Sequence, residues 1–444
     1  MKIAQLALNS YDNYGNLLQK YALHKTLKKF ASSTEVLWYS GNNRFWVESG
    51  ELPPHSEFNP NDTTKFYLYE SVRMAKIKEF EERYVKVRFD LPYIEEIADE
   101  YDFFVMGSDQ VWNPFCGELA RMTPSIRFLD FVPREKKIAY AASIALKELP
   151  EKYIETWQRG ISTFPHISVR EANSVGLIKN LTGLDAELVI DPVLLLTPEE
   201  WLQVAQRPSW LNEKYERGYI LTYLFDNIRL PEVQRLSKEL NLPIINLLDI
   251  KNFNHYITGE SEFLYLFAHA TAIFTNSFHG TAFSILFKRP FVIYVAKNSW
   301  SDQTFERMNS ITKMFNLQDR VTTSTTNYKV KSPLEIDFSV RDKILPYERA
   351  KAFKFLTNAL SENNLNKGGA LTYENRRYDF KKSRRLFRLR SLHKCLPPKL
   401  YIYAPRRRRF CVSENQSRSL YKLRQVRKSL PRVEFQACNA RQVA

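Results

Sequence analysis

The fold class is indicated most clearly by Tyr101-Asp102-Phe103-Phe104-Val105-Met106-Gly107-Ser108-Asp109-Gln110-Val111-Trp112-Asn113. Residues 102–106, which are apolar after Asp102, end directly in glycine, serine and aspartate. Short apolar runs bounded by turn residues are typical of strands that are buried on both faces, as in parallel sheets. The stretch therefore predicts a buried strand whose carboxyl end carries polar side chains, which is where α/β folds bind ligands.

The same pattern recurs along the chain, with helical segments between the apolar runs. Further strands are predicted at residues 2–8, 35–39, 137–142, 167–169, 188–190, 219–225, 243–248, 272–275 and 291–295. Alternation of strands and helices predicts parallel sheets covered by helices on both faces. We therefore expect an α/β protein with two Rossmann-like domains, residues 1–192 and 193–365, the second closed by a helix near 340–361.

The charge of the 444-residue chain is concentrated at one end. Of its 65 Lys and Arg and 49 Asp and Glu, residues 371–444 hold 21 and 4, which leaves 44 basic and 45 acidic side chains elsewhere. Basic residues interleaved with apolar ones, as in Leu386-Phe387-Arg388, suit an anionic membrane surface. For this basic tail, residues 366–444, a solvated extension is the alternative. Nucleic acid is not expected, because no recognition module accompanies the charge.

Several classes of protein are not expected from this composition. The four cysteines include no Cys-x-x-Cys pair and the histidines are isolated, so neither a disulfide framework nor a metal centre is predicted. No Gly-x-Gly-x-x-Gly or Walker-type loop follows a strand, which argues against a dinucleotide or P-loop cofactor. The apolar runs are too short to span a bilayer. We expect a cytoplasmic protein that uses no cofactor.

In the second half, the segment Asn276-Ser277-Phe278-His279-Gly280 joins a predicted strand to a helix. A helix N-terminus has free N–H groups and a partial positive charge, so an anion fits there. His279 beside it could donate a proton. The alternative interpretation is that Ser277 and His279 only cap the helix.

In the first half, four segments follow predicted strands. Arg170 can form bidentate hydrogen bonds with a phosphate or carboxylate, or a surface ion pair with Glu171. Asp109 could act as a base or as a cap, and Trp112 could line a sugar site or belong to the core. Asp12-Asn13-Tyr14-Gly15-Asn16 is explained largely by an N-cap and a tight turn. Asp191 precedes a proline at the end of its strand.

Together these segments resemble the polysaccharide pyruvyl transferase family. The resemblance covers roughly residues 1–325 and rests on five motifs in the family's order. They are residues 12–19, residues 101–113, Ile167-Ser168-Val169-Arg170-Glu171, Val189-Ile190-Asp191-Pro192, and Thr275–Gly280 with Lys288-Arg289-Pro290-Phe291. The family's better-studied members have Arg-Leu-His where this chain has Ser277-Phe278-His279, so one anion-binding arginine is absent.

The resemblance implies two domains arranged as in glycosyltransferase-B folds. It also implies transfer of the enolpyruvyl unit of phosphoenolpyruvate to two hydroxyls of a lipid-linked or other glycan, giving a pyruvate ketal in surface polysaccharides. The resemblance places Arg170 and His279 at the phosphoenolpyruvate site. Because the reaction needs an acid and a base, we expect His279 to be the acid and Asp109 or Glu171 the base. The expected substrate-binding residues are Arg170, Ser277, Asn276, Gly280, Asn13, Tyr14, Ser108, Trp112, Asn113 and Asp191.

Two other functions remain open at this point. One is a sugar-nucleotide-dependent glycosyltransferase of the same fold class, and the other is a non-catalytic carbohydrate-binding protein. For the transferase we expect Arg170→Ala and His279→Ala each to abolish transfer without unfolding the protein.

Overall fold

The computed structural model describes residues 1–8, 13–39, 63–91, 97–115, 124–225, 231–295, 301–322 and 333–361. These residues belong to one compact unit. The basic tail, residues 366–444, lies outside the described residues, so the expectation that it meets a membrane surface stays a prediction. Among the helices that are described, none combines the length and the apolar character needed to cross a bilayer.

Within the described residues, the first sheet has seven strands. In sheet order they are β3 (Val87–Leu91), β2 (Ser33–Tyr39), β1 (Lys2–Leu6), β4 (Phe103–Met106), β5 (Lys137–Ala142), β6 (His166–Val169) and β7 (Glu187–Leu188). Neighbouring strands are parallel throughout. The sequence analysis did not predict β3, whose apolar and charged residues alternate because it lies at the sheet edge.

The second sheet has five strands in the described part of the chain. In sheet order they are β12 (Val321–Thr322), β11 (Phe291–Tyr294), β10 (Ala272–Thr275), β8 (Ile220–Tyr223) and β9 (Ile244–Asn246). These strands are also parallel. Two parallel-sheet α/β domains are the expected fold class, which is confirmed. β12 was not predicted, because two residues are too few for a periodic pattern.

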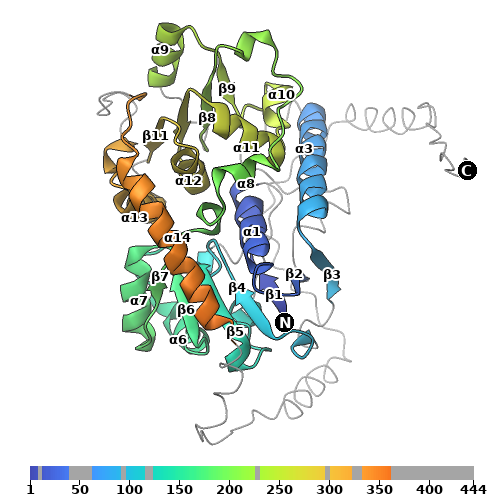
Figure 1. Cartoon of the computed structure of the whole chain (residues 1–444), viewed down its shortest axis with the longest axis vertical. Helices are drawn as coiled ribbons and strands as arrows, with labels where there is room; N and C mark the ends of the chain where they lie inside the picture. The colour runs from blue at the N-terminus through green and yellow to red at the C-terminus, as the bar shows by residue number, and fades with distance from the viewer. Residues whose placement is uncertain are drawn as a thin grey trace, which may run out of the picture. The chain divides into compact units, whose positions relative to one another are not determined.

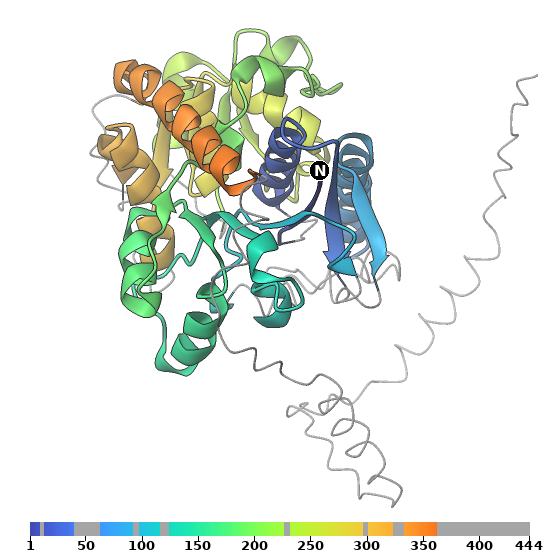
Figure 2. The same ribbon diagram turned by 60° about the horizontal axis from the view of Figure 1, so that its bottom comes forward.

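Helices lie on both faces of the two sheets (Figures 1 and 2). In the first domain they are α1 (Tyr14–Leu27), α3 (Thr63–Tyr84), α5 (Pro124–Arg127), α6 (Glu151–Ile161) and α7 (Ala172–Thr182). Those after the first sheet are α8 (Pro198–Leu202), α9 (Pro231–Leu240), α10 (Phe253–Tyr256), α11 (Glu260–His269), α12 (Phe278–Leu286), α13 (Ser301–Met314) and α14 (Ser339–Ala359). Short 3₁₀ turns are η2 (Arg134–Lys136), η3 (Pro192–Leu194), η4 (Glu213–Tyr215) and η5 (Gln318–Arg320).

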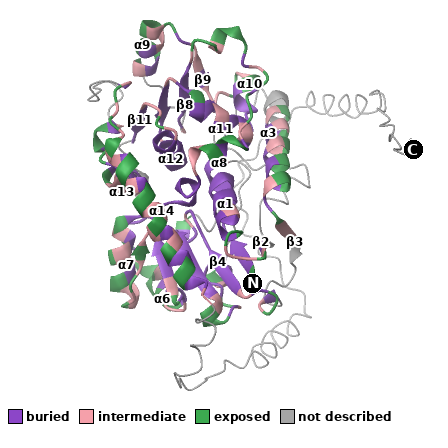
Figure 3. Ribbon diagram, viewed as in Figure 1, coloured by how far each residue is buried: buried purple, intermediate pink, exposed green. Residues whose placement is uncertain are grey.

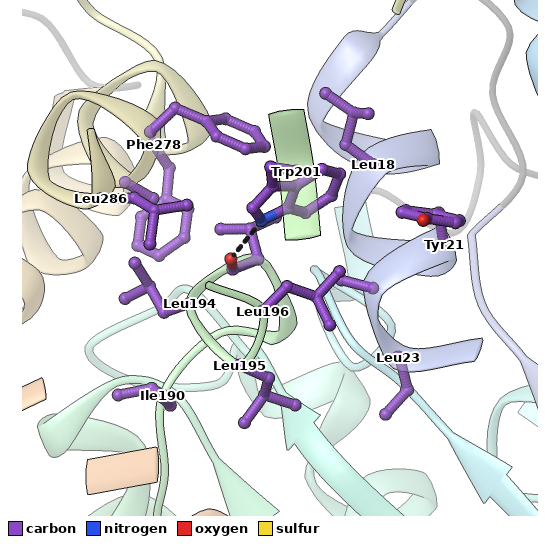
Figure 4. Close-up of a cluster of buried hydrophobic side chains, with 14 of the residues drawn as sticks. Leu18, Tyr21, Leu23, Ile190, Leu194, Leu195, Leu196, Trp201, Phe278 and Leu286 are labelled. Carbon is purple, nitrogen blue, oxygen red and sulfur yellow. Dashed lines mark hydrogen bonds between the residues drawn. The ribbon is translucent and has the colours of Figure 1, made fainter. Parts of the chain in front are cut away.

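The two inner helices, α1 and α12, both pack against the turn η3 and also contact each other. Every residue of α12 is buried, and so is every residue of α1 except Lys25 (Figure 3). Trp201 fills the space between them: its ring lies 5.4 Å from Tyr21 and 5.1 Å from Phe283, and its Nε1 donates to the carbonyl of Val193 at 3.0 Å (Figure 4). One hydrophobic core therefore continues from the first sheet to the second.

The closing helix α14 ties the turn η3 to the second domain. Arg349 donates to the carbonyls of Leu194 and Leu196, and Arg341 donates to those of Ile285 and Leu286 at the end of α12. These bonds satisfy carbonyls that a helix end or turn leaves without partners. The boundary between the domains, placed at residues 192 and 193, stays a proposal because the core is shared.

A buried carboxyl group lies at the start of α11. Glu260 is 1% exposed, and among the described residues neither of its carboxylate oxygens has a hydrogen-bond partner. Burial raises the pKa of Glu260 to about 8, although its own backbone amide and the charges of Arg73 and Lys20 partly oppose the shift. Lys20 is itself paired with Glu81 at 2.9 Å, so Glu260 shares this cation with another carboxylate.

We predict that Glu260→Gln changes how stability depends on pH. An unfolded glutamate has an ordinary pKa near 4.5, so between pH 4.5 and 8 the native state binds more protons than the unfolded state. The stability that comes from protonated Glu260 is therefore full below pH 4.5 and is lost as pH rises through about 8. Relative to the wild type, Glu260→Gln should gain up to about 1.4 kcal/mol per pH unit in this window.

Urea denaturation between pH 5 and pH 8 measures this effect. Glu155→Gln, at an exposed position of α6, is the control. A constant stability difference between Glu260→Gln and the wild type across the range would contradict the prediction.

Candidate functional site

Four of the predicted polar segments meet at the carboxyl ends of the strands. Asp109 follows β4, Arg170 follows β6 and Asp191 follows β7, all in the first sheet. His279 follows β10 of the second sheet and lies in the first turn of α12. The structure therefore joins residues of both domains at one place, which parallel sheets favour because all their strands end on the same edge.

Arg170 is the centre of this group. Its Nη2 donates to Asp109 Oδ1 at 2.9 Å, its Nε to Glu171 Oε1 at 2.9 Å and its Nη1 to Asp191 Oδ2 at 2.6 Å. The residue is 4% exposed, and its guanidinium lies 4.3 Å above the centre of the Phe278 ring. Each of its three nitrogens thus contacts a carboxylate, so Arg170 fastens three segments of the first domain to one another.

The local backbone places each carboxylate. Asp109 has a left-handed φ of 67°, which turns the chain after β4, and its carbonyl accepts from the amide of Ser143 at 3.0 Å. Before it, Gly107 has φ of 136°, and a Cβ there would lie 2.1 Å from the Tyr140 carbonyl oxygen. Only glycine allows this close approach. Asp191 caps η3 by accepting from the amide of Val193, which leaves its other oxygen for Arg170.

His279 completes the group from the second domain. It is 5% exposed, and its Nε2 lies 3.7 Å from Asp191 Oδ2, an ion-pair distance that is too long for a hydrogen bond. Among the described residues, no hydrogen-bond partner reaches Nε2. The imidazole is therefore held beside a carboxylate, with its Nε2 buried and without a hydrogen bond in the described structure.

The environment separates the proton affinities of the carboxyl groups. Burial opposes ionisation of Asp109, but the charge of Arg170 and smaller contributions from neighbouring groups together outweigh burial and lower the pKa of Asp109 to about 2. Burial also raises the pKa of Asp191, yet His279 and Arg170 lower it more, so this pKa lies below its ordinary value. For Glu171 burial wins over Arg170, and the pKa of this carboxyl is raised. Such a divergence suits one group to accept a proton and another to stay ionised.

Two residues of this site were not predicted. Asn16, in the first turn of α1, donates from Nδ2 to Asp109 Oδ2 at 3.3 Å. Arg307 of α13 adds a second positive charge, which favours the ionised form of both Asp109 and Glu171, although the pKa of Glu171 stays raised. Asn16 belongs to a motif that the sequence analysis quoted, so its position was a signal. No sequence pattern pointed to Arg307.

The other predicted residues near α12 shape the loop that precedes it. Ser277 Oγ accepts from the amide of Gly280 at 3.3 Å and so caps the helix, and Asn276 Oδ1 accepts from the amide of Phe225 at 2.8 Å. A Cβ at Gly280 would lie 2.4 Å from Oγ1 of Thr275. The capping interpretation thus describes Ser277, while His279 makes no cap. Substrate contacts of these residues stay predictions.

Around Asp109, the predicted residues are also bonded within the fold. Ser108 Oγ donates to the Ala141 carbonyl at 2.8 Å, and Asn113 is completely buried. Trp112 is completely buried too, with its ring 5.5 Å from Phe164. In this structure the Trp112 side chain belongs to the core, as its alternative interpretation holds, and it offers no surface to a sugar.

The predicted residues at the start of α1 connect the two domains. Asn13 Oδ1 accepts from the amide of Asn16 and caps α1. Tyr14, which is completely buried, donates from its hydroxyl to the carbonyl of Thr258 at 2.6 Å and stacks on Phe263 at 4.6 Å. Tyr14 therefore anchors the first turn of α1 to the second domain.

We predict that Arg170→Ala strongly destabilises the protein, which changes the expectation drawn from the sequence. Without the guanidinium, three carboxyl groups would be buried next to one another with no cation between them. Removing one partner of a buried ion pair typically costs about 3–5 kcal/mol. The midpoint of urea denaturation at pH 7 should fall clearly.

Arg235→Ala is the matched control, because Arg235 also joins two carboxylates, Glu232 and Glu239, but is exposed. Surface pairs of this kind contribute little to stability. Adding Asp109→Asn to Arg170→Ala should restore part of the midpoint. A wild-type midpoint for Arg170→Ala would show that the cluster does not stabilise the fold.

A comparison with known proteins adds the following. The model of the family described as polysaccharide pyruvyl transferase matches residues 13–298, which include Asp109, Arg170, Asp191 and His279. No curated protein gives a significant match.

Three solved structures are similar at low identity. The UDP-GlcNAc 2-epimerase from Neisseria meningitidis bound to UDP-GlcNAc is 10% identical with a TM-score of 0.40, covering 81% of this chain and 100% of that chain. The UDP-GlcNAc 2-epimerase from Methanocaldococcus jannaschii is 14% identical with a TM-score of 0.36, covering 78% of this chain and 100% of that chain. UGT89C1 from Arabidopsis thaliana complexed with UDP is 11% identical with a TM-score of 0.40, covering 82% of this chain and 98% of that chain. Likenesses at this level carry no conclusion, whereas the family match spans well over half of the sequence: the chain belongs to the polysaccharide pyruvyl transferase family.

Proposed function

We propose that this protein transfers the enolpyruvyl unit of phosphoenolpyruvate to two hydroxyls of a sugar, forming a pyruvate ketal in surface polysaccharide synthesis. Membership of the family supports the reaction class. The observation that carries the proposal is the pair formed by His279 and Asp191, with Nε2 of the buried imidazole lacking a hydrogen-bond partner in the described structure. A buried imidazole beside a carboxylate suits proton transfer.

The reaction requires an acid, and His279 fits this part. Protonated His279 would give its proton to carbon 3 of phosphoenolpyruvate, which makes carbon 2 electrophilic. The carboxylate of Asp191, 3.7 Å away, would stabilise the imidazolium before the transfer. Positioned acids of this kind typically contribute about 10²–10⁴-fold to the rate.

The hydroxyls require a base, for which Asp109 and Glu171 are the candidates. One hydroxyl oxygen bonds to carbon 2 and loses its proton, and the second displaces inorganic phosphate from the same carbon. Two carbon–oxygen bonds form and one breaks, one proton ends on the new methyl group and one leaves with phosphate. Glu171 suits the base, because its raised pKa lets it hold a proton that Asp109 would release.

The donor is an anion, so the site must hold it with positive charge. Arg170 already contacts three carboxylates, so it can hold the donor only if one of them yields. Among the described residues, Arg307 and the N-terminus of α12 also bring positive charge to the site. The engagement of Arg170, together with serine at position 277, favours a second candidate function, which is carbohydrate binding without transfer.

Ligand binding separates these functions from a nucleotide-sugar transferase. Thermal shifts are measured with phosphoenolpyruvate, with UDP-sugars and with a glycan panel. The proposed function requires stabilisation by phosphoenolpyruvate, together with a pyruvate-ketal product found by mass spectrometry. A shift with glycans alone and no product would instead support the binding protein.

We predict that His279→Gln lowers the turnover of phosphoenolpyruvate at saturating donor by at least about 10²-fold, because glutamine cannot supply the proton. Lipid-linked and nitrophenyl glycosides serve as acceptors, and mass spectrometry reads the ketal. His269→Gln, at an exposed position of α11, is the control and should keep wild-type turnover. Near-normal turnover of His279→Gln would exclude the imidazole as the acid.

We also propose that the basic tail attaches the protein to the inner face of the membrane, near lipid-linked acceptors. Removing residues 371–444 takes away 21 basic and 4 acidic side chains. Binding to anionic vesicles should then fall, and the full chain should bind more weakly at 1 M salt than at 0.1 M, since the Debye length shortens from about 10 Å to about 3 Å. Co-sedimentation of both proteins with anionic and neutral vesicles tests this. Equal sedimentation would leave the tail as a solvated extension.

A further inference from the structure

We propose that Gly15 is a positioning residue that holds the His279 imidazole in place. Gly15 lies in the first turn of α1, in the first domain, whereas His279 belongs to α12 in the second. A Cβ at Gly15 would lie 2.0 Å from Nδ1, 2.3 Å from Cγ and 2.7 Å from Cβ of His279. The backbone of α1 therefore lies directly against the histidine, where no larger residue fits.

The imidazole has little room to move away from this contact. His279 is 5% exposed, its ring meets Phe278 edge-on at 5.3 Å, and Asp191 lies at its Nε2. All nine residues of α12 are buried, so the helix that carries His279 is packed on every side. A methyl group added at position 15 would thus push the ring toward Asp191 or rotate it from its rotamer.

The first turn of α1 is fixed as firmly as the imidazole. On one side of Gly15 the Tyr14 hydroxyl donates to the carbonyl of Thr258, and on the other Asn16 Nδ2 donates to Asp109. Three consecutive residues of α1 thus contact the second domain, the histidine and the carboxylate cluster. This arrangement fixes the distance between His279 and Asp109, although the two belong to different domains.

Glycine is unfavourable inside a helix, and α7 offers a matched comparison. At Gly176, in the middle of α7, a Cβ would meet nothing within 4 Å. Gly176→Ala should therefore keep or improve stability, as alanine does in helices. Gly15→Ala should do the opposite, and the difference isolates the contact with His279 from the general effect of the substitution.

A double-mutant cycle tests the contact itself. Gly15→Ala is made in the wild-type chain and in His279→Gly, where both the imidazole and the Cβ that Gly15→Ala would meet are absent. We expect Gly15→Ala to lower the urea midpoint in the wild-type chain and to leave it unchanged or raised in the His279→Gly chain. If Gly15→Ala alone does not fold, the double variant should still fold. An equal loss in both chains, or a double variant that does not fold, would overturn the inference.

Spectroscopy and kinetics test the consequence for the site. With ¹³C-labelled histidine, the Cε1–H signal of His279 is assigned by its loss in His279→Ala. Gly15→Ala should shift this signal and Gly176→Ala should not; an unshifted signal in folded Gly15→Ala would overturn the inference. The role in catalysis rests on the proposed function. There, Gly15→Ala should lower kcat for transfer by about 100-fold, with little change in KM for phosphoenolpyruvate, as expected for a misplaced acid.

The two proposals can fail separately. If the wild-type chain transfers nothing from phosphoenolpyruvate, the proposed function fails, while the cycle and the His279 signal still decide whether Gly15 positions the imidazole. If the wild-type chain is active and Gly15→Ala keeps its kcat, the positioning role fails and the proposed function stands.

Discussion

The bonds from Arg170 to Asp109, Glu171 and Asp191 are the interaction on which the site depends. Each carboxylate follows a strand of the first sheet, so one guanidinium fixes the relative positions of three loops. A planar group with donors on three nitrogens can do this, whereas the point charge of a lysine could not. Because the group is buried, removing any one of these charges would leave the others without a partner in a low-dielectric surrounding.

The second domain reaches this cluster through the two most buried helices. α1 comes from the first domain and α12 from the second, and both pack against η3, which directly follows Asp191. Trp201 fills the core between them, while Arg349 of α14 holds the carbonyls of the same turn. The position of His279 beside Asp191 is thus a consequence of how the shared core packs, and the contact of Gly15 with the imidazole adds the last restraint.

The electrostatics of the cluster decide which chemistry it can support. One guanidinium faces three carboxyl groups, so the site needs further positive charge or a bound proton. Glu171, whose pKa is raised by burial, can take up that proton, and Arg307 supplies a second cation. A site of this kind suits proton transfer better than it suits the capture of a highly charged anion. The identity of the donor is therefore tested most directly by measuring which ligands the protein binds.

The fold class could be predicted from the amino-acid sequence, because strands of parallel sheets are buried on both faces and appear as continuous apolar runs. The sequence analysis missed β3 and β12, edge strands that are either half polar or very short. It also located the segments of the site, since polar residues at strand ends mark one edge of a sheet. Only the tertiary structure decided which of them touch: Trp112 is in the core, Arg170 is enclosed by carboxylates, and Gly15 lies against His279. Such contacts depend on strand order and on the packing of α1 against α12, and neither is encoded in the local pattern around any one residue.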